Sequence, residues 1–214
     1  MTHTERTHVV FGAALALMGL FAIIATRRPG TPVRTAWPVL ALCLGLVLFI
    51  PVESQTRTYS RLDWGPFFLT LVPDNPATWI SDWFQRARAA HVVQHKVGGF
   101  FTMLAGLVEL GIARGWLRRT GWAHFLPVCL VVVGLAFGIH GGSSHHLPFS
   151  IEQVHHHLLG FGFITGGLTL GLHQAGVLPH RRWALAWPAL AILVGLSLAL
   201  LYRLPPEAAG HLMH

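Results

Sequence analysis

The sequence predicts an all-α membrane protein, a polytopic bundle of six transmembrane helices made of three repeated helical hairpins. Of its 214 residues, 53% are hydrophobic and only 11% are charged, whereas a soluble domain carries about a quarter charged residues. The apolar residues fall in six blocks, each long enough to cross a hydrocarbon core of about 30 Å as a helix. No block alternates polar and apolar residues as the strands of a membrane barrel do. We therefore expect a single transmembrane domain over residues 1–214.

The six blocks define the expected helices. They run from Val9 to Ala25, Ala36 to Val52, His91 to Ala113, Trp122 to His140, His155 to Ala175 and Trp183 to Tyr202. The first block is interpreted as a retained helix and not as a signal peptide, because Arg27 and Arg28 follow the apolar stretch and no small-residue cleavage site is found. Cys43 and Cys129 lie in separate blocks, and each is expected to be a small buried apolar side chain.

Two motifs repeat three times along the chain. The odd-numbered helices share His-x3-Gly-x6-Gly-Leu, which begins at His8, His95 and His156. The even-numbered helices share Pro-x6-Gly-Leu, which begins at Pro38, Pro127 and Pro188. Paired glycines mark stripes where a neighbouring helix can approach closely, and a proline fits the first turn of a helix. The repeat defines hairpin 1 (residues 8–52), hairpin 2 (91–140) and hairpin 3 (155–202).

Charge predicts the orientation of the hairpins. The three loops inside the hairpins are short and contain only basic charged residues: Arg27, Arg28 and Arg34; Arg114, Arg118 and Arg119; Arg181 and Arg182. The positive-inside rule therefore places these loops in the cytoplasm, with both termini outside a bacterial inner (plasma) membrane. Segment 53–90 forms an outer-face loop, in which an amphipathic helix follows Asn75 and Pro76. This helix would either lie on the outer leaflet or cap the bundle.

Histidine is the residue type that indicates a functional site in this sequence. Of 15 histidines, 12 fall on the predicted outer side. Helices three, four and five all bring imidazoles to one depth there, and imidazole is the commonest protein ligand for copper and zinc. The predicted metal ligands are His91, His95, His140, His145, His155, His156 and His157. Hairpin 1 contains fewer histidines than hairpins 2 and 3, so we expect it to be a scaffold. The histidine that opens the motif of each odd-numbered helix could have a partly structural role.

Copper is the expected metal, with zinc as an alternative. The tail His211-Leu212-Met213-His214 adds a thioether, which favours copper, and the scarcity of carboxylates argues against calcium or magnesium. A single b-type haem is a second alternative, held by His95 with His140 or His156, with Gly98, Gly99 and Gly160 making room for the porphyrin. A metal-free scaffold subunit is the third.

Glu109 is the one acidic residue inside an expected helix. It lies 14 residues beyond His95, close to the cytoplasmic end of its helix. A structural role, in which the carboxylate reaches the interface or pairs with arginine, is favoured over an ion path. No continuous row of polar residues connects Glu109 to the histidines, which weakens the hypothesis of a transporter.

The outer-face histidines, with His95-x3-Gly99 and the run His155-His156-His157, resemble those of copper-resistance D-type membrane proteins. The resemblance covers about the last 125 residues and implies periplasmic copper handling. Members usually have more helices, so transport activity is not implied. The expected partners are the lipid bilayer, subunits of a membrane complex or a periplasmic metal carrier. The distribution of the +7 net charge fits membrane topology and not nucleic acid binding. The sequence shows no motif for ATP binding, nucleophilic catalysis or a Gly-rich phosphate loop, which leaves an enzymatic function open but not favoured.

Overall fold

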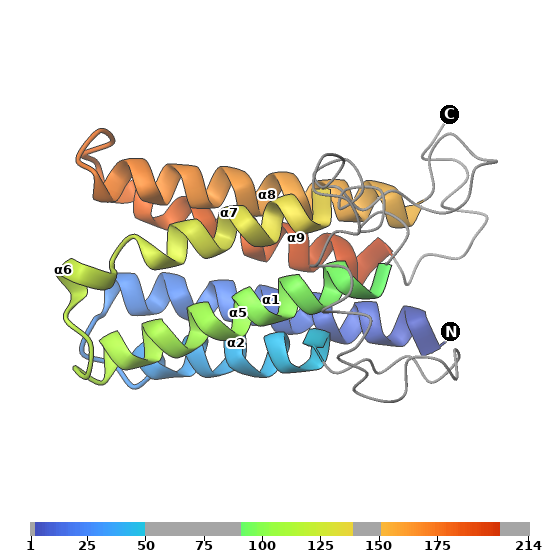
Figure 1. Cartoon of the computed structure of the whole chain (residues 1–214), viewed down its shortest axis with the longest axis horizontal. Helices are drawn as coiled ribbons and strands as arrows, with labels where there is room; N and C mark the ends of the chain where they lie inside the picture. The colour runs from blue at the N-terminus through green and yellow to red at the C-terminus, as the bar shows by residue number, and fades with distance from the viewer. Residues whose placement is uncertain (1–2, 50–90, 139–150, 202–214) are drawn as a thin grey trace, which may run out of the picture.

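The computed structural model describes residues 3–49, 91–138 and 151–201, whose secondary structure consists of helices joined by short turns, with no strand among them. The predicted all-α class is therefore confirmed for this part of the chain. The expected amphipathic helix within 53–90 lies outside the described residues. Figure 1 shows the helices as one bundle of long, roughly parallel rods. They are α1 (His3–Arg27), α2 (Val33–Phe49), α5 (His91–Ala113), the short α6 (Arg119–Trp122), α7 (Phe125–Gly138), α8 (Ile151–Gln174), the 3-10 turn η1 (Arg181–Leu185) and α9 (Ala186–Leu201).

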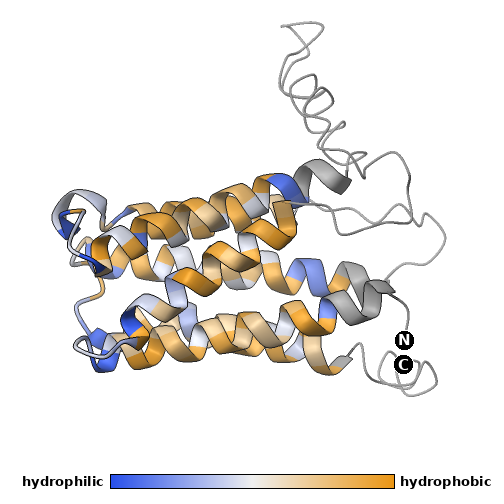
Figure 2. Ribbon diagram, turned by 90° about the horizontal axis from the view of Figure 1, so that it is seen from below, coloured by the Kyte–Doolittle hydropathy of each residue, from blue (hydrophilic) through white to orange (hydrophobic). Residues whose placement is uncertain are grey.

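The chain is a multi-pass membrane protein. Four of the described helical segments are long and apolar enough to cross a membrane: His8–Arg27, His95–Ala113, Arg119–Gly138 and Arg181–Leu200. The α2 helix is apolar but has only 17 residues, and the histidines and glycines of α8 lower its mean hydropathy. Hydrophobic residues cover the length of the bundle, whereas hydrophilic residues gather at its two ends (Figure 2). Such an apolar outer surface suits contact with lipid.

The prolines of the even-numbered helices are not all in the first turn. Pro127 and Pro188 each stand at the third residue of α7 and α9, as predicted. The prediction is wrong for Pro38, which lies inside α2, because that helix begins at Val33. A proline removes one backbone hydrogen bond and crowds the carbonyl four residues earlier. In the second hairpin a break after α6 precedes Pro127, and in the third the 3-10 turn η1 precedes Pro188. In the first hairpin, α2 is one continuous helix that includes Pro38.

The glycine motifs form the contacts between the helices. Packing is most extensive between α2 and α5, between α7 and α8, and between α9 and α1. In each of these three interfaces, a methyl group added to either facing glycine would lie 2.5–2.9 Å from the carbonyl oxygen of the other. The facing pairs are Gly45 with Gly99, Gly134 with Gly160, and Gly195 with Gly12. Only glycine permits this approach, so the closest packing joins the even helix of one hairpin to the odd helix of the next.

The three interfaces make the bundle a closed ring. The helices within a hairpin also touch, α1 with α2, α5 with α7, and α8 with α9. Contacts therefore run around all six long helices described, and the last helix, α9, returns to the first. All three described connections between long helices lie at the same end of the bundle, which we call the loop end (Figure 1). The opposite end, where His8, His95 and His156 lie near the starts of α1, α5 and α8, is called the histidine end.

Two of the loop-end connections begin with the same glycine cap. Gly115 after α5 and Gly176 after α8 have φ values of 77° and 80°, a left-handed conformation that glycine adopts without steric cost. The amides of Trp116 and Val177 then bond back to the carbonyls of Gly111 and Leu172. These caps satisfy carbonyls at the helix ends and turn the chain towards the next helix.

The interior between the two ends is apolar. The rings of Trp37 and Trp187, from α2 and α9, have centroids 5.3 Å apart, and Leu15 and Cys129 are each only 1% exposed. The prediction of a buried side chain is thus confirmed for Cys129. It is wrong for Cys43, which is exposed, because it lies on the outward face of α2 together with Val39, Leu46 and Val47.

Candidate functional site

Three histidines from three helices meet at the histidine end. They are His8 of α1, His95 of α5 and His156 of α8, the residues that open the repeated motif of each odd-numbered helix. The ring centroid of His156 lies 6.5 Å from that of His8 and 6.1 Å from that of His95. Each histidine precedes by four residues a glycine that packs against a neighbouring helix. One helical turn separates the two positions, so the glycine contacts set the depth at which all three imidazoles lie.

The run of three histidines on α8 divides between the interior and the surface. His155 is 2% exposed and His156 is 9% exposed, whereas His157 is exposed. Successive residues on a helix are about 100° apart, so three in a row cannot all face inwards. His155 is next to His156 in the chain and is buried at the same end of the bundle. His155 therefore belongs to the same group of imidazoles as the three aligned histidines, and we call these four residues the histidine cluster.

Phe137 of α7 closes one side of the histidine cluster. Its ring stacks on His156 with a centroid distance of 6.0 Å and an interplanar angle of 27°. It also meets His95 edge-on at 5.8 Å. An aromatic wall of this kind fixes ring orientation and excludes water from one side. Phe137 thus packs against both His95 and His156, although α7 itself has no histidine among its described residues.

The spacing of the imidazoles can be compared with that of a metal site. Two imidazoles on one tetrahedral ion have ring centroids about 5 Å apart, given metal–nitrogen bonds of about 2.0–2.1 Å. The separations of 6.1 and 6.5 Å are somewhat wider. No group of three or more His, Cys, Asp or Glu side chains in the described residues already has the arrangement of a metal site. Metal binding by the histidine cluster would require its rings to draw closer together.

The seven histidines predicted as ligands have different outcomes. His95, His155 and His156 lie together, and His157 is exposed. His140 and His145 lie outside the described residues, as does the side chain of His91. Sequence reasoning did not include His8, although its place in the repeat was the signal that could have found it. It also missed Lys96, which follows His95 and is 8% exposed.

The glycines offered as room for a porphyrin are used in helix packing. A methyl group added at Gly98 would lie 3.0 Å from the ring of Phe137. One added at Gly99 would meet the backbone of α2, and one at Gly160 the backbone of α7. The space beside these three glycines is therefore filled by side chains and backbone of the described helices, which does not fit a macrocycle there.

Comparison with known proteins finds no family model, no curated protein and no solved structure that matches the chain.

Proposed function

We propose that the chain forms six transmembrane helices as three equivalent hairpins around a pseudo-threefold axis. The support comes from the glycines, since Gly45–Gly99, Gly134–Gly160 and Gly195–Gly12 are the same contact at the same motif positions. The second glycine of the His-x3-Gly-x6-Gly-Leu motif shows the same agreement, because a methyl group there would meet the carbonyl oxygen of the motif proline in the neighbouring even-numbered helix. These pairs are Gly106 with Pro38, Gly167 with Pro127 and Gly19 with Pro188.

The loop end of the bundle faces the cytoplasm in this proposal. The connections at this end hold eight arginines and no acidic residue. Arg27, Arg118 and Arg182, one from each hairpin, are exposed there. Short basic loops are retained in the cytoplasm during membrane insertion. The histidine end then faces the outside, which in a bacterium is the periplasm.

The histidine cluster is a binding site for one copper or zinc ion. The observation that carries this proposal is the convergence of His8, His95 and His156 from three helices, with centroid distances of 6.1 and 6.5 Å. Neutral imidazole is a good ligand for copper and zinc. Three such ligands leave a coordination position open, and His155 is buried beside them. Calcium and magnesium prefer oxygen ligands, and none of the four side chains of the cluster supplies one.

The residues around the cluster have distinct tasks in this site. The glycine contacts of α1, α5 and α8 hold the three ligands at one depth, and Phe137 restricts the rings of His95 and His156. The bound ion could be passed to a partner protein or received from it. Ring centroids about 1–1.5 Å closer would match the spacing of imidazoles on one tetrahedral ion, and side-chain rotation permits a shift of that size.

The site serves metal handling at one membrane face and not conduction across the membrane. Between the histidine end and the loop end, the axis of the bundle is lined by apolar residues such as Leu15, Met18 and Leu44. The polar Thr102 is there too, but its hydroxyl donates to the carbonyl of Gly98 at 2.7 Å. A periplasmic metal carrier, or a subunit of a larger membrane complex, is the partner that fits a site on this face. The same role is implied by the resemblance of the histidine motifs to those of copper-resistance D-type proteins.

Metal titration of the full-length protein in detergent tests the proposal. The purified protein, stripped with a chelator, is titrated with copper or zinc against a competing chromophoric chelator. We expect one ion per chain for the wild type, and a loss of affinity of at least about 10-fold in His95→Ala and in His156→Ala.

His157→Ala is the matched control, because His157 lies on the same helix turn but is exposed. It should bind metal as the wild type does. If neither ion binds to the wild type, or if His157→Ala loses as much affinity as His156→Ala, the histidine cluster is not the site.

A further inference from the structure

A polar cavity of about 350 Å3 opens at the loop end of the bundle, at the opposite end from the histidine cluster. All three hairpins contribute to its wall. Ala22, Glu109 and Leu170 stand at the same position of the repeat, and each lines the cavity. Trp37 and Trp187 form its floor against the apolar core. We call this space the loop-end cavity.

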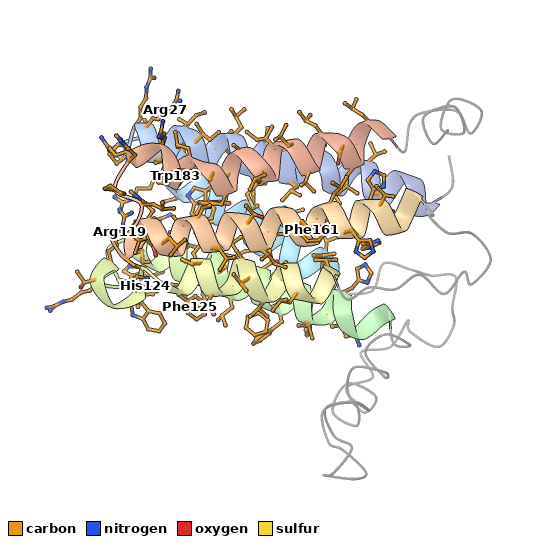
Figure 3. All side chains as sticks on the ribbon, turned by 90° about the horizontal axis from the view of Figure 1, so that it is seen from above. Arg27, Arg119, His124, Phe125, Phe161 and Trp183 are labelled. Carbon is orange, nitrogen blue, oxygen red and sulfur yellow. The ribbon has the colours of Figure 1, made fainter. Side chains whose placement is uncertain are left out.

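The charged residues of the loop-end cavity are mainly arginines. Arg34 comes from the start of α2, Arg119 from α6 and Arg181 from η1, so each hairpin supplies one. Figure 3 labels Arg119 at this end of the bundle. Glu109 is the one acidic residue among the described residues of the lining. One carboxylate cannot neutralise three guanidinium groups, so the cavity is suited to an anion.

The cavity also offers hydrogen-bond acceptors. The side-chain oxygen of Gln174 is buried and has no hydrogen-bond partner among the described residues. Glu109 supplies two more acceptor oxygens. His173 also lines the cavity, and its Nδ1 donates to the carbonyl of Leu178 at 2.6 Å. A ligand that satisfies these groups must carry donors as well as negative charge.

We propose that the loop-end cavity binds a glycerol phosphate group, with the phosphate on the arginines and the hydroxyl groups on Glu109 and Gln174. Guanidinium groups bind phosphate oxygens through paired, charge-assisted hydrogen bonds. A volume of about 350 Å3 is at the lower end of the range for small-molecule pockets, about 300–1,000 Å3. The group could arrive as the headgroup of phosphatidylglycerol or as free glycerol phosphate. Basic pockets between transmembrane helices are suited to anionic headgroups.

Two measurements on the full-length protein distinguish these sources. In the lipid arm, the protein is placed in nanodiscs of equal phosphatidylglycerol and phosphatidylcholine, and native mass spectrometry counts the lipids that stay bound. In the soluble arm, the protein in phosphatidylcholine nanodiscs is titrated with glycerol 3-phosphate by calorimetry. The variants are Arg34→Gln, Arg119→Gln and Arg181→Gln. Arg27→Gln is the matched control, since Arg27 is at the same end, is exposed and does not line the cavity.

We expect the wild type and Arg27→Gln to retain phosphatidylglycerol over phosphatidylcholine, or to bind glycerol 3-phosphate, and each cavity variant to lose at least about 5-fold of that binding. Glu109→Gln keeps an acceptor oxygen for the hydroxyl group and has no charge that opposes the phosphate, so it should bind the same ligand at least as tightly as the wild type does. Thermal unfolding of each variant checks that it is folded. Absence of specific binding in both arms, an equal loss in Arg27→Gln, or weaker binding in Glu109→Gln would overturn the proposal.

Discussion

His8 packs edge-on against His156, with ring centroids 6.5 Å apart and ring planes at 88°. The two residues belong to the first and third hairpins of the chain, which the closed ring of helices brings together along α1 and α9. The first hairpin, expected to be only a scaffold because it is poor in histidine, thus contributes a side chain to the histidine cluster. The aligned position in the repeat identifies three members of the cluster, His8, His95 and His156, and His155 joins them from the run of histidines on α8.

His8→Ala should weaken copper or zinc binding at least about 10-fold, as much as His95→Ala does. Both changes remove one imidazole from the same group of three. Competition titration with a chromophoric chelator measures the affinity. His124→Ala serves as a control, since His124 is exposed near the loop end (Figure 3). An unchanged affinity in His8→Ala would restrict the site to the second and third hairpins.

Metal affinity should fall as the pH is lowered. Imidazole binds metal as the neutral base and gains a proton as the pH drops below about 6.5. Protons therefore compete with the ion for the imidazole nitrogens, and metal affinity decreases as the pH falls. Repeating the titration between pH 7.5 and 5.5 should show a decrease of at least about 10-fold. A flat profile would mean that the ligands are not histidines.

Gly99→Ala should destabilise the bundle, because the added methyl group would lie 2.7 Å from the carbonyl oxygen of Gly45. Overpacking of this kind costs about 1–3 kcal/mol. A thiol-reactive dye can follow thermal unfolding through Cys129, which is buried, in a Cys43→Ser background that removes the exposed thiol. Gly121→Ala, which meets no atom within 4 Å, should leave the midpoint unchanged. Equal midpoints for the two variants would contradict the close approach of α2 and α5.

Much of the helical framework could be predicted from the sequence. The bounds of α5, His91–Ala113, agree with the predicted block, because its apolar run ends at a glycine cap and basic residues. The partner of each helix could not be predicted. A glycine stripe shows that a backbone approaches, but Gly45 could equally have faced the odd helix of its own hairpin. The contact with Gly99 depends on the ring as a whole.

The candidate site could be predicted only in part, for a similar physical reason. The excess of histidine singled out His95, His155 and His156, but the depth of burial of each ring depends on the helix rotation set by the glycine contacts. That rotation buries His155 and His156 and exposes His157. Pro38 gives another example, since a proline cannot show how many helical residues precede it, and α2 begins five residues earlier at Val33.

A cysteine placed at the loop end should be inaccessible from outside the cell. In a background without Cys43 and Cys129, Gly30→Cys and Gly121→Cys put a thiol in connections that are open in space. The basic loops predict that a membrane-impermeant maleimide labels them only after the cells are permeabilised. Labelling of intact cells would reverse the orientation and place the histidine cluster in the cytoplasm.

X-ray absorption spectroscopy of the copper- or zinc-loaded protein tests the metal site most directly. We predict a first shell of nitrogen at about 2.0–2.1 Å, with outer-shell scattering from about three imidazoles and one fewer in each of His8→Ala, His95→Ala and His156→Ala. A first shell of oxygen alone, or an imidazole number unchanged in all three variants, would contradict binding by the histidine cluster.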